Sequence, residues 1–460
     1  MDMDKILKVH FIGIGGIGMS ACAKLMKVLE KEVTGSDVYP SEITEELEKM
    51  GVKIFRGHSF EQVADDVDLV IYSSAVPEDN EERKKARELG VTELSYFEFL
   101  GEYSRDKYTI AISGTHGKST TTAMLGKILT DAGLDPTVIV GSKLKSFEHG
   151  NFRFGRSKYL VVEACEYKAN FLKLDPNILI ITNIEAEHLD YYKDIEDVAA
   201  AFQRLADKLP EDGVLVYNAD DSVSVEMIEP RTETISYSLQ KEATFEARNL
   251  MQEPGQQSFD LLKDGEGYLA EVKLEIPGKF NIYNALSAIS AADRLGAKPE
   301  DIKKSIQGFG GLWRRMEVVG EYKGALIISD YGHHPTEVIG AIQAVEDFYP
   351  EKRIVWVYQP HHHNRTKELF NDFVKSFGGV DVLLMSDIYD VAGREEAQDQ
   401  DIHSKILAKE IEAISPNVAV YYTGDLKQTR QAVDEYVKEG DVVVFQGAGT
   451  IDEIVRDLIK

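Results

Sequence analysis

A candidate phosphate-binding sequence, GTHGKSTTT, spans residues 114–122 and directly follows the apolar run YTIAIS. A strand that turns through glycines into a helix presents backbone N–H groups and the positive end of the helix dipole to an anion. Lys118 is expected to reach the β- and γ-phosphates of a nucleoside triphosphate, and Ser119 to ligate Mg²⁺. The chain has Ile112 where the full phosphate-loop motif has glycine, so the sequence predicts a shortened loop.

Acidic and imidazole side chains follow the next two apolar runs. Glu163 ends the run YLVVE, and His188 follows the run NILIITNI within TNIEAEHLDYY. Ligands of α/β sheets gather at the carboxyl ends of the strands. Ser119, Glu163 and His188 therefore form a predicted divalent-metal set beside the triphosphate. A hydrogen-bonded structural role is the alternative for His188.

A second glycine turn, GIGGIG, spans residues 13–18 between an apolar run and a helix-like stretch. Gly13, Gly15 and Gly18 fit the dinucleotide fingerprint, and Asp37 lies where an acid that binds a ribose is expected. The fingerprint alone suggests NAD or FAD. The alternative is a packing turn with no ligand, so the nucleotide stays open at this point.

Polar clusters mark the second half of the chain. Asn281 and Asn284 lie one helical turn apart and could meet one face of a base, although helix capping also explains them. DYGHHPTE (330–337) and QPHHHNRT (359–366) each follow an apolar run. Consecutive side chains cannot all point at one ion, so the histidines 361–363 indicate a substrate loop rather than a metal cluster.

The apolar runs are short, rich in Val and Ile and do not alternate with polar residues, which is typical of strands covered on both faces. They lie at 8–14, 69–75, 108–114, 159–164, 177–184, 214–218, 325–332, 353–359, 380–388 and 441–447. Helices are expected between them, for example at 20–32, 119–133 and 278–292. This alternation predicts α/β domains with doubly wound, mainly parallel sheets.

The composition excludes several classes of function. The 460 residues carry 52 Lys+Arg and 79 Asp+Glu, a net charge of −27. So acidic a surface opposes nucleic-acid and membrane partners. Cys22 and Cys165 are too few for a disulfide framework and suit a reducing compartment. We find no signal-peptide core and no apolar run near the ~18 residues of a membrane span, so a cytoplasmic protein is expected.

Taken together, these segments resemble the Mur ligase family over nearly the whole chain. The resemblance rests on HFIGIGGIGMS, VTGSD, VIYSSAVP, GTHGKSTTTAM, TNIEAEH, the paired asparagines, DYGHHPTE, QPHHHNRT and FQGAGT. It implies three domains: a Rossmann-like UDP-sugar domain (1–106), a P-loop ATPase-like domain with a mainly parallel sheet (107–313) and a Rossmann-like amino-acid domain (314–460). It also implies that the GIGGIG turn holds a UDP pyrophosphate and no redox cofactor.

The activity that the resemblance implies is ATP-dependent ligation of L-alanine to the carboxylate of UDP-N-acetylmuramate through an acylphosphate, in peptidoglycan precursor synthesis. The implied cofactors are ATP and Mg²⁺, and the implied partners are these small molecules. The enzyme is expected to be a monomer or a homodimer. Its parts are expected to assemble the site only on domain closure.

Site residues carry over from the family position by position. The implied catalytic residues are Lys118, His188, His333 and Arg365. ATP contacts are implied for Gly114, Thr115, His116, Gly117, Lys118, Ser119, Thr120, Asn281, Asn284, Arg314, Arg315 and Asp330, and metal contacts for Ser119, Glu163 and His188. UDP-sugar contacts are implied for Gly13, Gly15, Gly16, Gly18, Ser36, Asp37, Ser73 and Ser74, and contacts to the sugar carboxylate and amino acid for Tyr331, His333, His361 and Arg365.

Two departures from the family pattern keep the amino donor open. The segment commonly written EADESD reads EACEYK here, and His362 stands where an arginine is common. Glycine, L-serine or a preformed tripeptide are the alternatives to L-alanine, the tripeptide being the donor of a recycling ligase. A non-catalytic Mur-like subunit is the rival from another class. His333 is a candidate for accepting the amine proton because an unperturbed imidazole titrates near 6.5.

Overall fold

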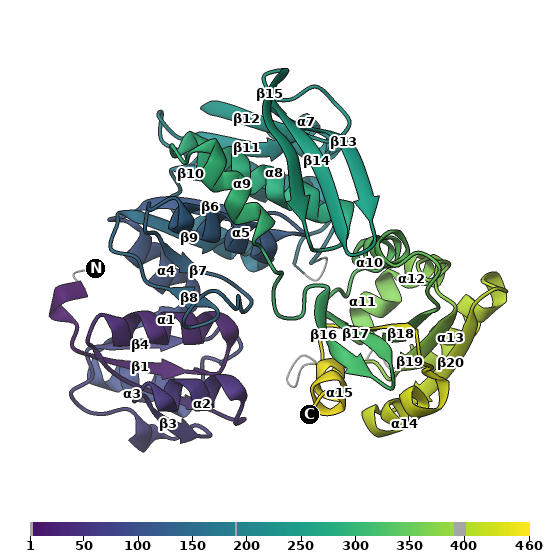
Figure 1. The fold of residues 1–460 in the computed structure, drawn as a ribbon. Helices are drawn as coiled ribbons and strands as arrows, with labels where there is room; N and C mark the ends of the chain where they lie inside the picture. Colours follow the sequence, from purple (N-terminus) through teal and green to yellow (C-terminus); the bar gives the residue numbers. More distant parts are fainter. Residues whose placement is uncertain (1–2, 189–190, 391–401) are drawn as a thin grey trace. The chain divides into compact units, whose positions relative to one another are not determined.

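The computed structural model describes residues 3–188, 191–390 and 402–460, in which strands alternate with helices (Figure 1). These residues contain a five-, a ten- and a six-stranded sheet, each mainly parallel or with a parallel core. By compactness the chain forms two units. One comprises Met1–Arg248, Leu261–Leu269 and Tyr283–Ile306, and the other Asn249–Asp260, Ala270–Ile282 and Gln307–Lys460. In the described ranges, no helix combines the length and the apolar character that a membrane crossing requires.

The N-terminal sheet is parallel, with the order β3-β2-β1-β4-β5. Its strands are β1 Lys8–Ile12, β2 Glu32–Asp37, β3 Lys53–Arg56, β4 Leu69–Tyr72 and β5 Thr92–Ser95, and its helices α1 Ile17–Val28, α2 Glu42–Lys49, α3 Glu81–Leu89 and α4 Tyr96–Ser104. Alternate residues of β1 face opposite sides: Phe11 packs with α1 and α4, and Ile12 packs with α3. The chain reverses its direction of winding between β1 and β4, where α/β sheets bind ligands.

The central sheet has the order β15-β14-β13-β12-β11-β10-β6-β9-β7-β8. Its strands are β6 Tyr108–Ser113, β7 Thr137–Ile139, β8 Phe152–Arg153, β9 Tyr159–Glu163, β10 Ile178–Ile181, β11 Val214–Asn218, β12 Glu233–Ser238, β13 Phe245–Glu253, β14 Gln256–Lys263 and β15 Glu266–Leu274. Its helices are α5 Lys118–Asp131, α6 Ile195–Ala206, α7 Ser222–Met227, α8 Lys279–Arg294 and α9 Pro299–Gln307. Strand β6 lies between β9 and β10 and runs parallel to both, so the loops after these three strands meet at one edge.

The C-terminal sheet has the order β16-β17-β21-β18-β19-β20, and only β16 runs antiparallel to its neighbour. Its strands are β16 Glu317–Tyr322, β17 Ala325–Asp330, β18 Ile354–Tyr358, β19 Val382–Ser386, β20 Ala419–Gly424 and β21 Val442–Gln446. Its helices are α10 Pro335–Phe348, α11 His363–Glu368, α12 Phe370–Lys375, α13 Ser404–Ile414, α14 Leu426–Tyr436 and α15 Ile451–Leu458. On β18, Trp356 packs in the core formed with α10, α12 and α13, and Val357 packs in the core formed with α14 and α15.

The fold class and the ten strands expected from the sequence are confirmed, with ends trimmed by up to three residues. The apolar runs did not predict the remaining strands of the described residues, which are β2, β3, β5, β7, β8, β12, β13–β15, β16 and β20. Most of these strands are short, or polar residues interrupt their apolar run as in β13–β15, so they lack the continuous Val/Ile pattern of the ten. The first of the two compact units combines most residues of the first two expected domains, and parts of β13–β15 group with the C-terminal residues. The expected domain bounds stay predictions.

The aromatic contact between α6 and the segment before β10 offers a test of the central core. Phe202 is fully buried, and its ring centroid lies 5.1 Å from that of Phe171 in an edge-to-face arrangement. Phe202→Ala should lower the free energy of unfolding by about 3–5 kcal/mol, measured by urea unfolding followed by circular dichroism. Tyr39→Ala, at a side chain that is 69% exposed, should leave the transition unchanged. Equal effects of both substitutions would contradict this packing.

Candidate functional site

Residues Gly114–Gly117 form a tight turn between β6 and α5. Gly114 has φ +133° and Gly117 has φ +85°, conformations that side chains oppose. A Cβ on Gly114 would lie 2.0 Å from Thr182 Oγ1, and one on Gly117 would lie 2.2 Å from Asn284 Oδ1. Both glycines are therefore required by backbone conformation and by space, as the sequence predicts.

The residues after β10 hold this turn in place. Thr115 N donates to the Asn183 carbonyl and His116 N donates to Asn183 Oδ1, both at 2.9 Å. The Thr182 hydroxyl donates to the His116 carbonyl at 2.6 Å. Glu185 N donates to Thr115 Oγ1 at 2.8 Å. The loop is thus fixed before any ligand arrives, and the N-terminal amides of α5 are left at the sheet edge.

Lys118 begins α5 and folds back over the loop. Its Nζ donates to the carbonyls of Gly114 and Thr115, the latter at 2.9 Å, and to the Glu166 carboxylate at 3.0 Å. Burial lowers the pKa of Lys118, but the negative charges of Glu166 and of its neighbours, among them Glu187 and Glu163, together outweigh that effect and keep the net shift upward. The ammonium is therefore charged and already surrounded by oxygens, as it would be beside phosphates.

Glu166 is a site residue that the sequence reasoning missed. It is 3% exposed, and besides Lys118 it contacts His188 Nε2 at 3.3 Å. Burial raises its pKa, yet Lys118 and His188 reverse the shift and hold the carboxyl ionised. Its place three residues after Glu163, just beyond the strand end, was the available signal. The sequence instead predicted Glu163 as the site carboxylate, because Glu163 is the last residue of the strand.

The predicted metal residues divide between two carboxylates. Ser119 Oγ donates to Glu163 Oε1 at 3.2 Å, and Gly141 N donates to the other oxygen at 2.8 Å. His188 instead lies beside Glu166 and Glu187, with one ligand atom of each within 4.8 Å of the others. Hydroxyl and carboxylate oxygens are the ligands that Mg²⁺ prefers, so the oxygens of Ser119, Glu163, Glu166 and Glu187 fit this cation.

The two asparagines of α8 have different surroundings. Asn284 is buried, lies against Gly117 and accepts from Thr121 Oγ1 at 3.4 Å. Asn281 Nδ2 donates to the Pro277 carbonyl at 2.7 Å, a local helix-terminus bond. Thr120, also implied as a nucleotide contact, is buried on α5. The structure thus places Asn284 at the phosphate turn and gives Asn281 a local role.

The N-terminal glycine turn is held by the end of β2. Gly13 N and Ile14 N both donate to the Ser36 carbonyl, at 2.9 and 3.0 Å. Gly15 N donates to Asp37 Oδ2 at 2.8 Å. The Ser36 side chain is fully buried, so this residue supports the turn through its backbone rather than through an exposed hydroxyl.

The other predicted UDP-sugar residues lie after β1, at the start of α1, and after β4. A Cβ on Gly13 would lie 3.1 Å from Ser73 Cβ, so the two strand ends approach closely there. Ser74 beside it is exposed. Gly16 is the N-cap of α1, and a Cβ on Gly18 would lie 2.7 Å from the ring of Tyr96.

In the C-terminal unit, Arg314 and Asp330 tie loops together. Arg314 Nη2 donates to the carbonyls of Gly447 and Gly449, the latter at 3.0 Å. Asp330 accepts from Gly332 N at 2.8 Å and from Met316 N at 2.9 Å. Both side chains are buried and anchor the loops that end β17 and β21.

Aromatic and cationic side chains gather around Tyr331. The Arg315 guanidinium lies over the Tyr331 ring, 4.9 Å from its centroid, and Arg314 lies 5.0 Å from the same centroid. His333 Nδ1 lies 3.2 Å from the Tyr331 carbonyl, and its ring centroid lies 5.7 Å from that of His361. The structure therefore brings these predicted substrate residues together within the C-terminal unit.

His361 accepts a hydrogen bond from Arg365. The two atoms, His361 Nδ1 and Arg365 Nη1, lie 3.2 Å apart, and a guanidinium can only donate. Burial, followed by the neighbouring His333 and other cationic groups, lowers the pKa of His361 to about 2. His361 is therefore a neutral imidazole with its proton on Nε2.

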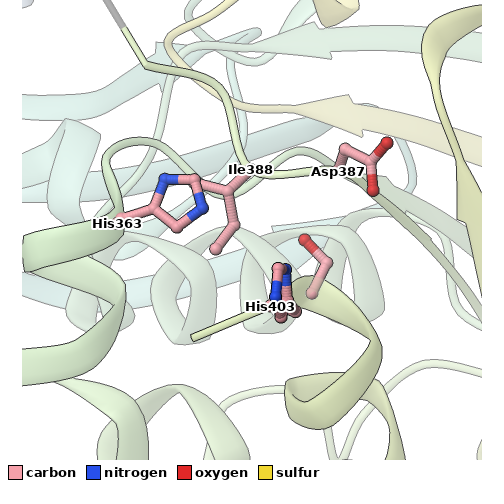
Figure 2. Close-up of a pocket in the computed structure, with 5 residues that line it drawn as sticks. His363, Asp387, Ile388 and His403 are labelled. Atoms are coloured by element: carbon pink, nitrogen blue, oxygen red, sulfur yellow. The ribbon is translucent and has the colours of Figure 1, made fainter. Parts of the chain in front are cut away.

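The next two histidines have another partner. Asp390 lies 3.4 Å from His362 Nδ1 and accepts a hydrogen bond at His363 Nδ1. His362 and His363 thus share the Asp390 carboxylate, whereas His361 is paired with Arg365. A small cavity beside them is lined by His363, Asp387, Ile388, His403 and Ser404 (Figure 2). Of these five, only His363 belongs to a segment that the sequence indicated, the predicted substrate loop QPHHHNRT.

Comparison with known proteins gives consistent matches along the chain. Residues 8–108 match the model described as Mur ligase family, catalytic domain; residues 112–292 match the Mur ligase middle domain; and residues 314–449 match the Mur ligase, glutamate ligase domain. A UDP-N-acetylmuramate–L-alanine ligase of Clostridium kluyveri is 41% identical, covering 98% of each chain. One from Aquifex aeolicus is 39% identical, covering 99% of this chain and 98% of its own.

Solved structures share the architecture. A UDP-N-acetylmuramate-alanine ligase from Thermotoga maritima aligns with a TM-score of 0.83 at 29% identity, covering 98% of each chain. A murein peptide ligase from Psychrobacter arcticus aligns with a TM-score of 0.72 at 23% identity and the same coverage, which shows a common fold.

Gly117 allows a test of the phosphate turn. Gly117→Ala should weaken ATP binding more than tenfold, measured by calorimetry, because its Cβ would displace Asn284. Gly133→Ala is the matched control: φ is +76° there, but no atom lies within 4 Å of the added Cβ. The control should lose about 1 kcal/mol of stability and keep its ATP affinity. Equal affinities for both variants would contradict the role of Gly117.

The neutral state of His361 predicts a pH dependence of stability. Between its lowered pKa of about 2 and the ordinary 6.5, the unfolded chain binds a proton that the folded chain does not. Acid should therefore destabilise the wild type below pH 6.5, at up to about 1.4 kcal/mol per pH unit from this group. His361→Gln should show a shallower fall in the free energy of unfolding between pH 6.5 and 5. Parallel profiles for the two proteins would refute the assignment.

Proposed function

Because the chain belongs to the Mur ligase family, we propose that it joins L-alanine to the carboxylate of UDP-N-acetylmuramate and converts ATP to ADP and phosphate. The observation that carries this proposal is the preformed phosphate turn with Lys118 charged inside it. Relatives about 40% identical over nearly the full chain bear the corresponding name. The reaction is a step of peptidoglycan precursor synthesis, which takes place in the cytoplasm.

The chemistry requires activation of the sugar carboxylate, since a carboxylate is a poor electrophile. Transfer of the ATP γ-phosphate gives an acylphosphate, which the amine attacks with loss of phosphate. Both steps gather negative charge on closely spaced oxygens. Lys118 stabilises this charge: its ammonium, which donates to the carbonyls of Gly114 and Thr115, donates to phosphate oxygens instead when the nucleotide is bound. The α5 amides beyond Gly117 orient the triphosphate by hydrogen bonding.

A divalent cation fits the carboxylates that flank the turn. Mg²⁺ held by Ser119 and Glu163, or by Glu166, Glu187 and His188, supplies neutralisation of phosphate charge when bound. Glu166 also keeps Lys118 in place while the nucleotide site is empty. His188 Nε2 lies 3.3 Å from Oε1 of the same carboxylate and helps to orient it.

The C-terminal residues suit recognition of a carboxylate and an amine. Arg365 donates to His361 Nδ1, and a guanidinium can bind a carboxylate through two parallel hydrogen bonds. His333 is the proposed acceptor of the amine proton. The tripeptide-adding alternative has less support, because the murein peptide ligase structures are 23% and 25% identical, whereas alanine ligases are about 40% identical. The non-catalytic alternative does not explain why a charged lysine is held in the phosphate turn by Glu166.

Substitution of Lys118 tests the catalytic half of the proposal. Lys118→Ala should abolish phosphate release in the presence of ATP, Mg²⁺, UDP-N-acetylmuramate and L-alanine, because the developing phosphate charge loses its cation. Binding of the UDP-sugar should persist, measured by calorimetry. Lys127→Ala, on the same helix and paired with Asp131, is the control and should keep the activity. Loss of UDP-sugar binding in the Lys118 variant would contradict the assignment of ATP binding and UDP-sugar binding to separate parts of the chain.

The amino donor is tested by comparing L-alanine, glycine, L-serine and the tripeptide in the same assay. L-alanine should give the highest kcat/KM. Phosphate release with the tripeptide alone would replace this proposal with the recycling activity. No release with any donor would support the non-catalytic alternative.

A further inference from the structure

A buried polar cluster joins the first helix of the N-terminal sheet to the central sheet. Lys24 on α1 and Asn151, directly before β8, are each 1% exposed. Lys24 Nζ donates to Asn151 Oδ1 and to the His149 carbonyl, both at 2.9 Å, and lies 3.0 Å from Glu46 Oε1 on α2. Three acceptors need three donors, so Lys24 is a charged ammonium. Burying such a charge is costly unless partners of this kind compensate for the loss of water.

Asn151 uses its whole amide group in this cluster. Its Oδ1 accepts from Lys24, and its Nδ2 donates to the Ile17 carbonyl and to Ser20 Oγ, the latter at 3.0 Å. Because an ammonium can only donate, the amide oxygen must face Lys24 and the nitrogen must face the backbone of α1. Ile17 is the first residue of α1 and directly follows Gly16. Asn151 is therefore attached to the start of the helix that the glycine turn opens.

The other end of the same loop reaches a predicted metal carboxylate. Residues 140–151 join β7 to β8, and Val140 N donates to the Asn151 carbonyl at 3.1 Å, which closes the loop at its base. The next residue, Gly141, donates from N to Glu163 Oε2 at 2.8 Å, and a Cβ there would lie 2.7 Å from that oxygen. Glu163 is thus connected to α1 through the base of this loop.

The polar cluster lies within a shared apolar core. The whole N-terminal sheet and most of the central sheet belong to one compact unit. One core cluster includes Phe11 and Met26 from the N-terminal part and Phe152 and Leu160 from the central part. Apolar burial has no preferred direction, whereas hydrogen bonds have a preferred distance and angle. The hydrogen bonds of the polar cluster therefore specify how α1 lies against the loop of residues 140–151.

Phosphoryl transfer depends on the alignment of the attacking oxygen with the γ-phosphate. In the proposed function, the sugar carboxylate is held by the N-terminal sheet and the γ-phosphate by the central sheet. We propose that Asn151, held by Lys24, is a positioning residue that fixes the Glu163 carboxylate relative to the glycine turn, so that the two ligands meet in line. The inference rests on the proposed function. Asn151 acts through Gly141 and α1 and is not itself a catalytic residue.

The test compares ligand binding with turnover in the full chain. Asn151→Ala should lower kcat for phosphate release with ATP, Mg²⁺, UDP-N-acetylmuramate and L-alanine by about tenfold or more, because the reacting groups lose their alignment. The dissociation constants of ATP and of UDP-N-acetylmuramate, each measured alone by calorimetry, should stay close to those of the wild type. A wild-type kcat overturns the inference. So does a loss of both affinities, which would show a merely structural role.

Asn177→Ala is the matched control. Asn177 Oδ1 accepts from Thr109 N at 2.8 Å near the amino end of β6, at the opposite edge of the central sheet from the phosphate turn. Loss of this bond should lower the midpoint of thermal unfolding, as the Asn151 substitution does, and should leave kcat unchanged. Equal losses of kcat in the two variants would show a general effect of destabilisation and overturn the inference.

Lys24→Met tests the cluster from its other side and also stands alone if Asn151→Ala does not fold. It removes the ammonium and keeps the bonds from Asn151 to α1, so kcat should fall with little change in either affinity. In the double variant, the loss of kcat should be smaller than the product of the two single losses, because both residues act through one cluster. Losses that multiply independently overturn the shared role.

Hydrogen–deuterium exchange gives a readout that does not require turnover. In the ligand-free chain, Asn151→Ala should speed exchange at the Gly141 amide, because the loop loses its attachment to α1. Asn177→Ala should leave exchange at Gly141 unchanged. Mass spectrometry of the peptide that contains Gly141 measures the rate. A wild-type rate in the Asn151 variant overturns the inference.

These outcomes are distinct from a failure of the proposed function. A wild type whose Gly141 exchange depends on Asn151, but which releases no phosphate with L-alanine, contradicts the ligase activity alone. An active ligase whose kcat and Gly141 exchange do not depend on Asn151 contradicts this inference alone.

Discussion

The buried ion pair between Lys118 and Glu166 is the constraint around which the candidate site is arranged. A buried ammonium is unfavourable without compensation, and here it has two loop carbonyls and a carboxylate. Glu166 in turn needs Lys118 and His188 to remain ionised away from water. Each group therefore fixes the others, and the phosphate turn keeps its shape without a nucleotide. This preorganisation reduces the cost of binding a triphosphate.

Parallel strand order explains how these groups meet. Glu163 ends β9, the phosphate turn follows β6, and the residues that hold the turn follow β10, so three neighbouring strand ends supply one site. The N-terminal sheet repeats this logic with the glycine turn after β1 and Asp37 on β2. The net charge of −27 repels anions from the surface as a whole. At the carboxyl edges of the N-terminal and central sheets, backbone amides and individual cationic side chains attract them locally.

The sequence predicted the Mur ligase family, the α/β class and the glycines of both turns, because each depends on local pattern. It did not predict Glu166 or Asn151. Their importance comes from partners distant in sequence: Glu166 meets Lys118, and Asn151 meets Lys24 and Ile17. The UDP-sugar contact implied for Ser36 stays a prediction, and the direction of its side chain depends on which face of β2 is buried. Domain boundaries and the roles of most carried-over residues stay predictions.

The central claim is that this chain activates a sugar carboxylate by phosphorylation before an amine attacks it. UDP-N-acetylmuramate labelled with ¹⁸O in its carboxylate, incubated with ATP, Mg²⁺ and L-alanine, tests that claim directly by mass spectrometry of the released phosphate. One ¹⁸O atom should pass to phosphate for each amide bond formed, because the bond that breaks lies between the carbonyl carbon and the bridging oxygen. Amide formation with unlabelled phosphate would contradict the acylphosphate route.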